Sequence, residues 1–404
     1  MSALDGIKVL DISEIMQAPL AAMMLADFGA DVTKVERPGV GDMLRPMDRY
    51  AAQNGLMSSY YASLNRNKRS ITLDLKSEGG RKIFLEMARK TDVLIHNYRP
   101  GAMERLGLDY DTLSAINPRL IYAVATAFGE SGPLSSKAGQ DMLAQTISGI
   151  TYATTQYLGQ PALLSTPLID LASGMTLAQG IAFALLERER SGLGQKVSVS
   201  LFDTALAGQM VEAASILMYG NDMNWIKNAL SFVFETSDGW ITVLGFFREN
   251  PLQRVCQALG IPDIASEPEF STLEKQVKAK DEIYARLKPA FLSYTTEECT
   301  KRLDSVDILC APVQSLKNAM SHVQCEINGM IAPITVDGQG TLRTLASPLK
   351  LSRTPAKRNS RVAALGADTL AILDELGIEG DAVEALARKG AFGPTPPFEE
   401  TAAS

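Results

Sequence analysis

Short apolar runs alternate with helix-like segments over the first half of the chain. The runs are rich in Val, Ile and Leu and are bounded by Gly, Asp and Asn, which is typical of buried strands. The predicted strands are residues 7–13, 31–36, 70–76, 92–98, 119–129 and 195–201, and the predicted helices are residues 18–29, 78–90 and 166–190. Because strands and helices alternate, we expect an α/β fold with a large Rossmann-like domain, in which helices cover both faces of a mostly parallel sheet.

The pattern changes after residue 220. Residues 231–236 and 240–247 are typical of a hairpin around Ser-Asp-Gly, and short helices rich in Lys and Glu follow them. From residue 331 an extended segment with prolines leads into a helix and a polar tail. We therefore expect a large α/β domain that starts with residues 1–220, a smaller α+β domain over residues 221–330, and a C-terminal segment, residues 331–404, that returns to the large domain.

The composition indicates a globular chain. It has 404 residues, of which 46% are hydrophobic and 21% charged, enough for about two domains with cores. The first residues lack a basic stretch followed by an apolar one, and no segment approaches the ~18 apolar residues of a membrane span, so we expect a cytoplasmic protein without a membrane partner. The cysteines form no CxxC pair and the histidines are few, which predicts reduced thiols and no metal site: Cys256, Cys299, Cys310, Cys325, His96 and His322.

The net charge of −7 argues against a nucleic-acid partner. Basic residues are nevertheless concentrated between positions 34 and 69, where they outnumber the acids. This segment could hold a small phosphorylated ligand, or it could be a solvated loop with an excess of Lys and Arg. The basic residues are Lys34, Arg37, Arg45, Arg49, Arg66, Lys68 and Arg69.

The predicted strand-helix-strand unit at the start of the chain invites a comparison with dinucleotide-binding folds. Glu36 follows at a distance that suits a contact with a ribose. However, the turn after the first strand reads EIMQAP and lacks the G-x-G-x-x-G that lets a pyrophosphate approach the backbone. This argues against a nicotinamide or flavin enzyme.

Asp170 stands just ahead of a run of Ala, Ser, Gly and Leu that predicts a buried helix. A carboxylate among apolar neighbours is costly unless it is paired, hydrogen-bonded or solvated. Two interpretations are open: Asp170 caps the helix, where its charge suits the dipole, or it is kept for chemistry.

Several stretches resemble, in order and spacing, the class III coenzyme A transferases of the CaiB/BaiF type, which include formyl-CoA transferase and carnitine CoA-transferase. The resemblance covers nearly the whole chain and is carried by LDGIKVLDIS, ADFGADVTKVERPGVGD, NRNKRSITLDLK, NYRPGAMERLGLDY, NPRLIYAVATAFGESGP, GQDMLAQTISG and IDLASGMTLAQGIAFALLERERSGLGQKVSVSLFDTAL.

The resemblance implies that CoA moves reversibly from an acyl-CoA thioester to a carboxylic acid. Asp170 would be the nucleophile, forming first a mixed anhydride and then an aspartyl-CoA thioester. Backbone N–H groups near residues 172–174 are candidates for stabilising the oxyanion. The resemblance further implies an interlocked homodimer, CoA esters and carboxylates as small-molecule substrates, and no tightly bound cofactor.

Contacts to CoA carry over from the family by matching position. Arginine binds phosphate with a planar fork and lysine adds a point charge. The residues that occupy the matching positions are Met16, Gln17, Arg37, Leu73, Lys76, Asn97, Tyr98, Arg105 and Lys137.

Two departures from the family patterns bear on the activity. Racemases of this superfamily carry a histidine in G-H-D where this chain has Gln140, and glutamine cannot exchange a proton at neutral pH. Transferase is therefore favoured over a CoA-ester racemase or isomerase. A non-catalytic acyl-CoA-binding protein is a further alternative, which would keep the basic contacts but would not need Asp170. Residues 219–239 also lack the glycine-rich loop of the formyl-CoA transferase branch, which argues against formate and oxalate as substrates.

Overall fold

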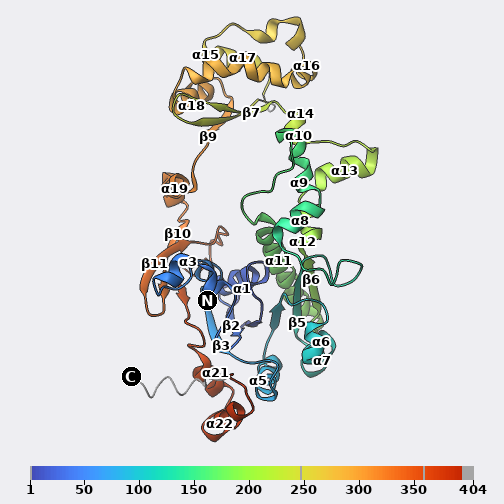
Figure 1. Cartoon of the computed structure of the whole chain (residues 1–404), viewed down its shortest axis with the longest axis vertical. Coiled ribbons are helices and arrows are strands. Elements are labelled where there is room, and N and C mark those ends of the chain that lie inside the picture. Colours follow the sequence, from blue (N-terminus) through green and yellow to red (C-terminus); the bar gives the residue numbers. More distant parts are fainter. Residues whose placement is uncertain (1, 246–247, 358–359, 394–404) are drawn as a thin grey trace. The chain divides into compact units, whose positions relative to one another are not determined.

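The computed structural model describes residues 2–245, 248–357 and 360–393, which form two compact units (Figure 1). The first unit contains residues 1–149, 163–208 and 324–404, and the second contains residues 150–162 and 209–323. This division departs from the expected boundary at residue 220. Helix α13 (Met210–Tyr219), which has no buried residue, belongs to the second unit.

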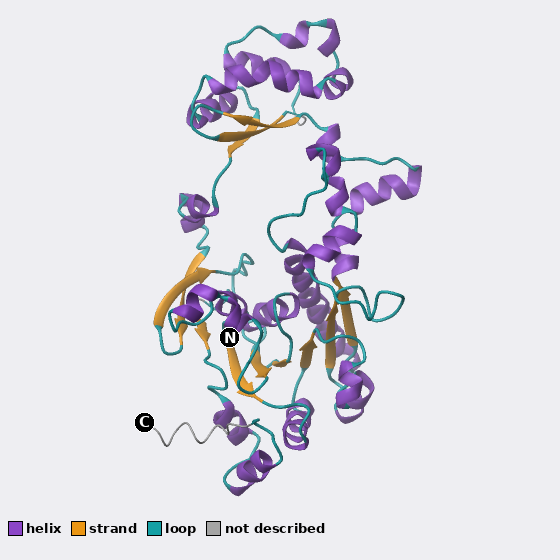
Figure 2. Ribbon diagram, viewed as in Figure 1, coloured by secondary structure: helices purple, strands orange, loops and turns teal. Residues whose placement is uncertain are grey.

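The first unit is built on a nine-stranded sheet in the order β11-β10-β12-β3-β2-β1-β4-β5-β6. Figure 2 shows strands in orange and helices in purple. All described pairs are parallel except β10 with β11. The large, mostly parallel sheet of the expected α/β fold is therefore confirmed. The strands are β1 (Lys8–Asp11), β2 (Asp31–Glu36), β3 (Lys68–Thr72), β4 (Val93–His96), β5 (Ile121–Thr126), β6 (Lys196–Ser200), β10 (Ile331–Val336), β11 (Gly340–Leu345) and β12 (Ser360–Val362).

The strand order places a topological switch point between β1 and β4. The chain runs outward from β1 through β2 to β3, and then returns to add β4, β5 and β6 on the other side. The loops that leave the carboxyl ends of β1 and β4 consequently diverge, and such a crevice is where open parallel sheets bind ligands.

Two hydrophobic cores lie on the opposite faces of this sheet. One core packs α5 (Glu78–Arg89) and α21 (Thr369–Glu375) against strand residues such as Leu94. The other packs α1 (Gln17–Asp27) and α11 (Leu168–Ser191) against strand residues such as Ile95. Both faces are thus covered by helices, as the alternating pattern predicts.

Helices α1 and α11 approach each other closely because small residues line the contact. A Cβ added to Gly174 of α11 would lie 2.5 Å from the backbone oxygen of Gln17, a distance that side-chain atoms do not tolerate. Alanines supply the α1 side of the contact, and they are fully buried. The packing of α1 on α11 therefore fixes the start of α11 against the loop that leaves β1.

Helix α11 corrects one expectation, because it is long and apolar enough to cross a membrane by length and composition. The helix packs against α1, β5 and β6, and Leu177 and Ile181 are fully buried in the core that they share. A core helix passes the same test of length and composition, and this packing identifies α11 as one.

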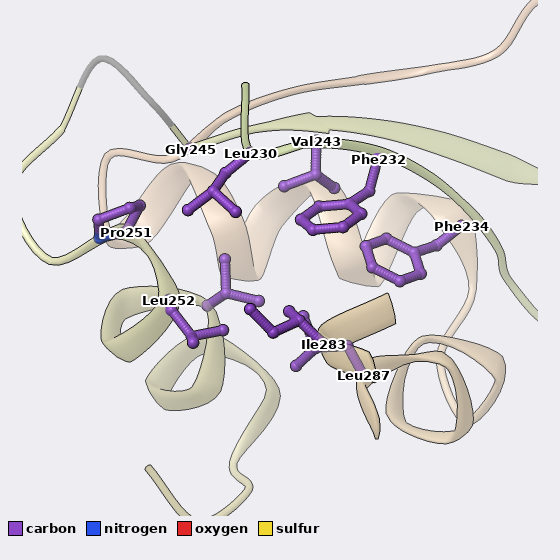
Figure 3. Close-up of a pocket in the computed structure, with 10 residues that line it drawn as sticks. Leu230, Phe232, Phe234, Val243, Gly245, Pro251, Leu252, Ile283 and Leu287 are labelled. Carbon is purple, nitrogen blue, oxygen red and sulfur yellow. The ribbon is translucent and has the colours of Figure 1, made fainter. Parts of the chain in front are cut away.

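The second unit has a three-stranded antiparallel sheet of β7 (Ser231–Glu235), β8 (Trp240–Leu244) and β9 (Leu309–Pro312). The predicted hairpin is β7–β8, and β9 adds a third strand that the sequence pattern does not predict. Helices α15 (Pro251–Leu259), α17 (Lys280–Leu292) and α18 (Thr296–Ser305) share a core with this sheet. Figure 3 shows an apolar pocket in the second unit, lined by aliphatic and aromatic side chains that include Phe232, Leu252 and Ile283. Its lining offers no group for acid, base or nucleophilic chemistry.

Most of the cations between residues 34 and 69 are not free for a ligand. Lys34 lies 2.9 Å from Asp42 and 3.6 Å from Asp11, and Lys68 lies 2.8 Å from Asp11, with all four side chains at most 1% exposed. Neither interpretation of the basic segment holds for these residues, because they are neither solvated nor available to a phosphate. Two further pairs are Arg45 with Glu36 and Arg66 with Asp27.

We expect Lys34→Met to destabilise the first unit. The substitution leaves Asp42 without its cation and removes the hydrogen bond from Lys34 to the backbone oxygen of Ser13. Breaking a buried pair typically costs about 3–5 kcal/mol. Urea unfolding should show this loss. Lys389→Met removes an exposed pair with Glu78 in the same unit, and should leave the free energy of unfolding nearly unchanged because solvent screens such a pair. Equal losses in the two variants would contradict a structural role for the buried network.

Candidate active site

Asp170 lies in the first turn of α11 but does not cap it. The N-cap residue is Pro167, whose side chain cannot accept a hydrogen bond, and the helix begins at Leu168. Within the described part of the chain, the half-buried carboxylate of Asp170 accepts no hydrogen bond. The capping interpretation of Asp170 is therefore wrong, and no described residue donates a hydrogen bond to its carboxylate, which keeps some contact with solvent.

Asp141 caps α11 from a neighbouring helix, α8 (Asp141–Ile147). Its Oδ2 accepts hydrogen bonds from the backbone N–H groups of Ile169, at 2.7 Å, and Asp170, at 2.8 Å. Gln145, one turn later in α8, donates to the other carboxylate oxygen and accepts from the backbone N–H of Leu164 at 2.9 Å. The carboxylate of Asp141 thus satisfies the orphan donors of the helix terminus and leaves the acid of Asp170 free.

Asp141 is not among the site residues predicted from the sequence. The signal was its position directly after Gln140, within the stretch that distinguishes transferases from racemases. A pattern of residues does not reveal that a carboxylate caps a helix that starts 27 residues further along the chain.

The environment of Asp170 raises its pKa to about 7, chiefly because burial disfavours the charged form and secondly because the charge of Asp141 lies nearby. A carboxyl group with such a pKa is a stronger nucleophile and base than an ordinary aspartate, and it can exist in either protonation state near neutrality. A raised pKa without a hydrogen-bond partner marks Asp170 as the best candidate for chemistry in the first unit.

Gln17 joins the loop after β1 to the helix of Asp170. Its Nε2 donates to the Oγ of Ser173 at 2.5 Å, and Ser173, which is fully buried, stands one turn after Asp170. Met16, the N-cap residue of α1, is half-buried beside it. The structure therefore brings Met16 and Gln17 to the same end of α11 as the candidate acid.

A second group of predicted residues meets around Glu14. Asn97, just after β4, accepts from the N–H of Glu14 at 3.0 Å and donates to its backbone oxygen at 2.7 Å. Arg37, just after β2, pairs with the Glu14 carboxylate at 3.0 Å. Burial raises the pKa of Tyr98 to about 12, and the charge of Glu14 adds to the shift. Arg37, Asn97 and Tyr98 thus lie together in the switch-point crevice.

The loop between these two groups is strained. Ile15 has φ of +71°, a conformation that costs a β-branched residue about 1–3 kcal/mol. Its N–H donates to Asp42 at 3.3 Å, and the preceding residue is held by Asn97. Strain of this kind persists where the surroundings fix the backbone, which is common at binding sites.

The remaining predicted contacts are not brought into either group. Leu73 is 1% exposed in the hydrophobic core, and its N–H donates to the backbone oxygen of Glu36. Its contact with CoA stays a prediction. Lys76, Arg105 and Lys137 are exposed on the loop after β3, on α6 (Ala102–Leu106) and in the loop before α8. They stay predictions.

The expected backbone donors at residues 172–174 are not available. These residues lie inside α11, where N–H groups bond to carbonyls four residues earlier. The four earlier N–H groups are also occupied, by Thr166, Asp141 and Pro167. Any oxyanion must find its donors elsewhere.

The described residues contain no group of three or more His, Cys, Asp or Glu that could hold a metal ion. The four cysteines are free thiols. Burial, with a smaller effect of Lys196, lowers the pKa of His96 to about 3, and its ring packs edge-on against Tyr122. His96 is therefore neutral and part of the packing.

We expect Asp170→Asn to become more stabilising as the pH rises. The pKa of Asp170 is higher in the folded chain than in the unfolded one, so the stability that protonation provides is lost as the pH rises from about 4 through about 7. Asparagine does not titrate. Urea unfolding at pH 5 and pH 8 should show the difference between variant and wild type shifting by roughly 1–3 kcal/mol in favour of the variant.

Asp141→Asn provides a control for the source of this shift. The variant keeps an oxygen that can accept from the N–H groups of Ile169 and Asp170 but removes the neighbouring charge. The pH dependence assigned to Asp170 should then shrink. A pH dependence that is unchanged in Asp170→Asn would show that Asp170 has an ordinary pKa.

Comparisons with known proteins agree with this architecture. Residues 4–369 match the model of CoA-transferase family III. The chain is 33% identical to an acetyl-CoA:oxalate CoA-transferase of Acetobacter aceti, over 86% of this chain and 89% of the relative, and 30% identical to a mouse succinyl-CoA:glutarate CoA-transferase, over 96% and 90%. A CAIB/BAIF family protein from Brucella suis has a similar structure, with a TM-score of 0.82 and 29% identity over 93% of this chain and 99% of that one. The chain belongs to CoA-transferase family III.

Proposed function

We propose that this protein transfers coenzyme A reversibly from an acyl-CoA thioester to a carboxylic acid, with Asp170 as the nucleophile. The observation that carries the proposal is the half-buried carboxylate at the start of α11, which has a raised pKa and no hydrogen-bond partner among the described residues. Membership of the family indicates the class of reaction, and the position of Asp170 indicates which residue acts as the nucleophile.

The reaction alternates anhydrides and thioesters on one side chain. Ionised Asp170 attacks the thioester carbonyl, the C–S bond breaks, and a mixed anhydride and CoA thiolate form. The thiolate attacks the aspartyl carbonyl, so the donor acid leaves and an aspartyl-CoA thioester remains. The acceptor carboxylate repeats the first step on this thioester, and the thiolate then takes the acceptor acyl group and frees Asp170. Each step exchanges one leaving group for one nucleophile, so neither water nor a redox cofactor is consumed.

CoA is expected to bind along the carboxyl edge of the sheet. Met16 and Gln17 would face the thioester because they lie at the start of α11, and Asn97 and Tyr98 line the crevice after β4. The exposed cations would hold the phosphates, namely Arg37, Lys76, Arg105 and Lys137.

The names of the relatives support a carboxylic acid as acceptor, since two of them are named for transfer to oxalate and to glutarate. We propose an interlocked homodimer in the cytoplasm, and exposed apolar side chains support a partner chain. Leu217, Met218 and Tyr219 of α13 are 70–85% exposed, which is unusual for large apolar residues.

An activated carbonyl on Asp170 is the expected sign of the mechanism. After incubation with a competent acyl-CoA, hydroxylamine should convert the side chain to a hydroxamate and borohydride should reduce the thioester. Peptide mass spectrometry should locate each mass change at Asp170. Asp170→Asn should lose several orders of magnitude of transfer while it keeps its fold, because an amide is a poor nucleophile. Full activity per folded molecule of this variant would refute the proposal.

The near-neutral pKa of Asp170 would also suit proton transfer in a CoA-ester racemase, so the two reactions need a direct test. A chiral 2-methylacyl-CoA incubated with the enzyme in deuterated water should keep its α-hydrogen, because Gln140 cannot act as the second acid or base. Mass spectrometry of the recovered thioester measures this. Deuterium uptake at catalytic rates would favour the racemase.

A further inference from the structure

Glu14 places a negative charge in the crevice, where we expect an anionic ligand to bind. Glu14 is in the loop after β1, and its Oε1 is 3.0 Å from Nη2 of Arg37. Its side chain is 24% exposed and that of Arg37 is 53% exposed, so both groups reach solvent at the edge of the sheet. A ligand that enters the crevice therefore meets an ion pair rather than a free cation.

Arg37 is an exposed cation beside the loop after β1 that a phosphate can reach. Lys34, on the preceding strand, is buried against Asp42, and Lys68 is buried against Asp11. The family acts on CoA thioesters, and CoA carries several phosphate charges. An anionic ligand in the crevice would consequently approach Arg37 and, with it, the negative charge of Glu14.

We propose that Glu14 is a positioning residue that holds Arg37 when CoA is absent and competes with a phosphate of CoA for the Arg37 guanidinium when CoA binds. This inference rests on the proposed function, because it requires CoA to occupy the crevice. In the free protein the carboxylate takes the place of a phosphate oxygen on Arg37, and in the complex it is a nearby like charge that weakens binding.

The backbone and side chain of Glu14 have separate roles. Asn97 binds only the backbone N–H and oxygen of Glu14, and these bonds set the path of the loop. The carboxylate alone contacts Arg37. Glu14→Gln therefore removes the charge while the bonds that shape the loop remain, which makes it a test of the carboxylate.

The charged groups around Glu14 fix the direction of its pH effect. Arg37 and Lys34 face it from β2 and the loop that follows, Asp42 faces it from the next loop, and Tyr98 faces it from the loop after β4. Burial raises the pKa of Glu14 above its usual value, although Arg37 opposes the shift. A phosphate beside Glu14 would raise this pKa further, so CoA binding should take up a proton and strengthen as the pH falls.

The test compares the binding of free CoA and of pantetheine, which shares the thiol arm but has no phosphate, by calorimetry at low salt and pH 7. Glu14→Gln should bind CoA about three to ten times more tightly than wild type and pantetheine equally well. The gain should shrink at high salt. It should also become smaller in an Arg37→Met background, because Glu14 and the phosphate then have no shared cation to compete for and only their mutual repulsion remains.

Glu384→Gln serves as the matched control, since it removes an exposed carboxylate paired with Arg388 on α22 (Asp381–Arg388). It should leave both affinities unchanged. Unchanged or weaker CoA binding by Glu14→Gln, or an equal gain for pantetheine, would overturn the inference while the proposed function stands. A wild-type protein that binds neither CoA nor acyl-CoA would overturn both.

Discussion

The first turn of α11 must satisfy its backbone N–H groups without using the acid that it carries. The structure meets this constraint by capping the helix with Asp141 from α8, so that the half-buried carboxylate of Asp170 has no hydrogen-bond partner among the residues that the structure describes. The cap has a second effect, because the same carboxylate adds to the burial that raises the pKa of Asp170. The hydrogen bonds of Asp141 therefore leave the Asp170 carboxylate free, and the charge of Asp141 helps to raise the pKa of Asp170.

The position of this helix end depends in turn on the contact between α1 and α11. Gly174 and the alanines of α1 bring the two backbones together, and Gln17 then reaches Ser173 across the contact. The loop that leaves β1 ends in α1, so the same packing aligns the switch-point crevice with the candidate nucleophile. Gln17 and Ser173, which are 156 positions apart in the sequence, thus meet through helix packing and a hydrogen bond.

Most strands of the large sheet could be predicted from the sequence, because buried parallel strands are short continuous runs of apolar residues. Strand β2 matches its predicted range, and α5 differs by one residue at its end. The third strand of the second unit, β9, could not be predicted in this way, because its residues are largely exposed and its place in a sheet depends on β8. Local patterns report burial and periodicity, and they do not report which distant strand completes a sheet.

The same distinction explains the candidate site. The position of Asp170 before a small-residue helix singled it out, but the cap that frees it comes from a different helix. A count of basic residues between positions 34 and 69 could not separate the buried Lys34 from the exposed Arg37, because the difference lies in partners such as Asp42 and Asp11 from other loops and strands.

The site also shows why the surrounding unit has to be strongly held. A carboxyl group with a raised pKa opposes folding at neutral pH, and the left-handed conformation of Ile15 adds backbone strain close by. Asp170 and Ile15, which carry these two costs, lie at the end of the sheet where the buried ion pairs of Lys34 and Lys68 join β1, β2 and β3. Because one rigid ion-pair network braces the strands whose loops carry the strain, the crevice can keep a costly geometry before any ligand arrives.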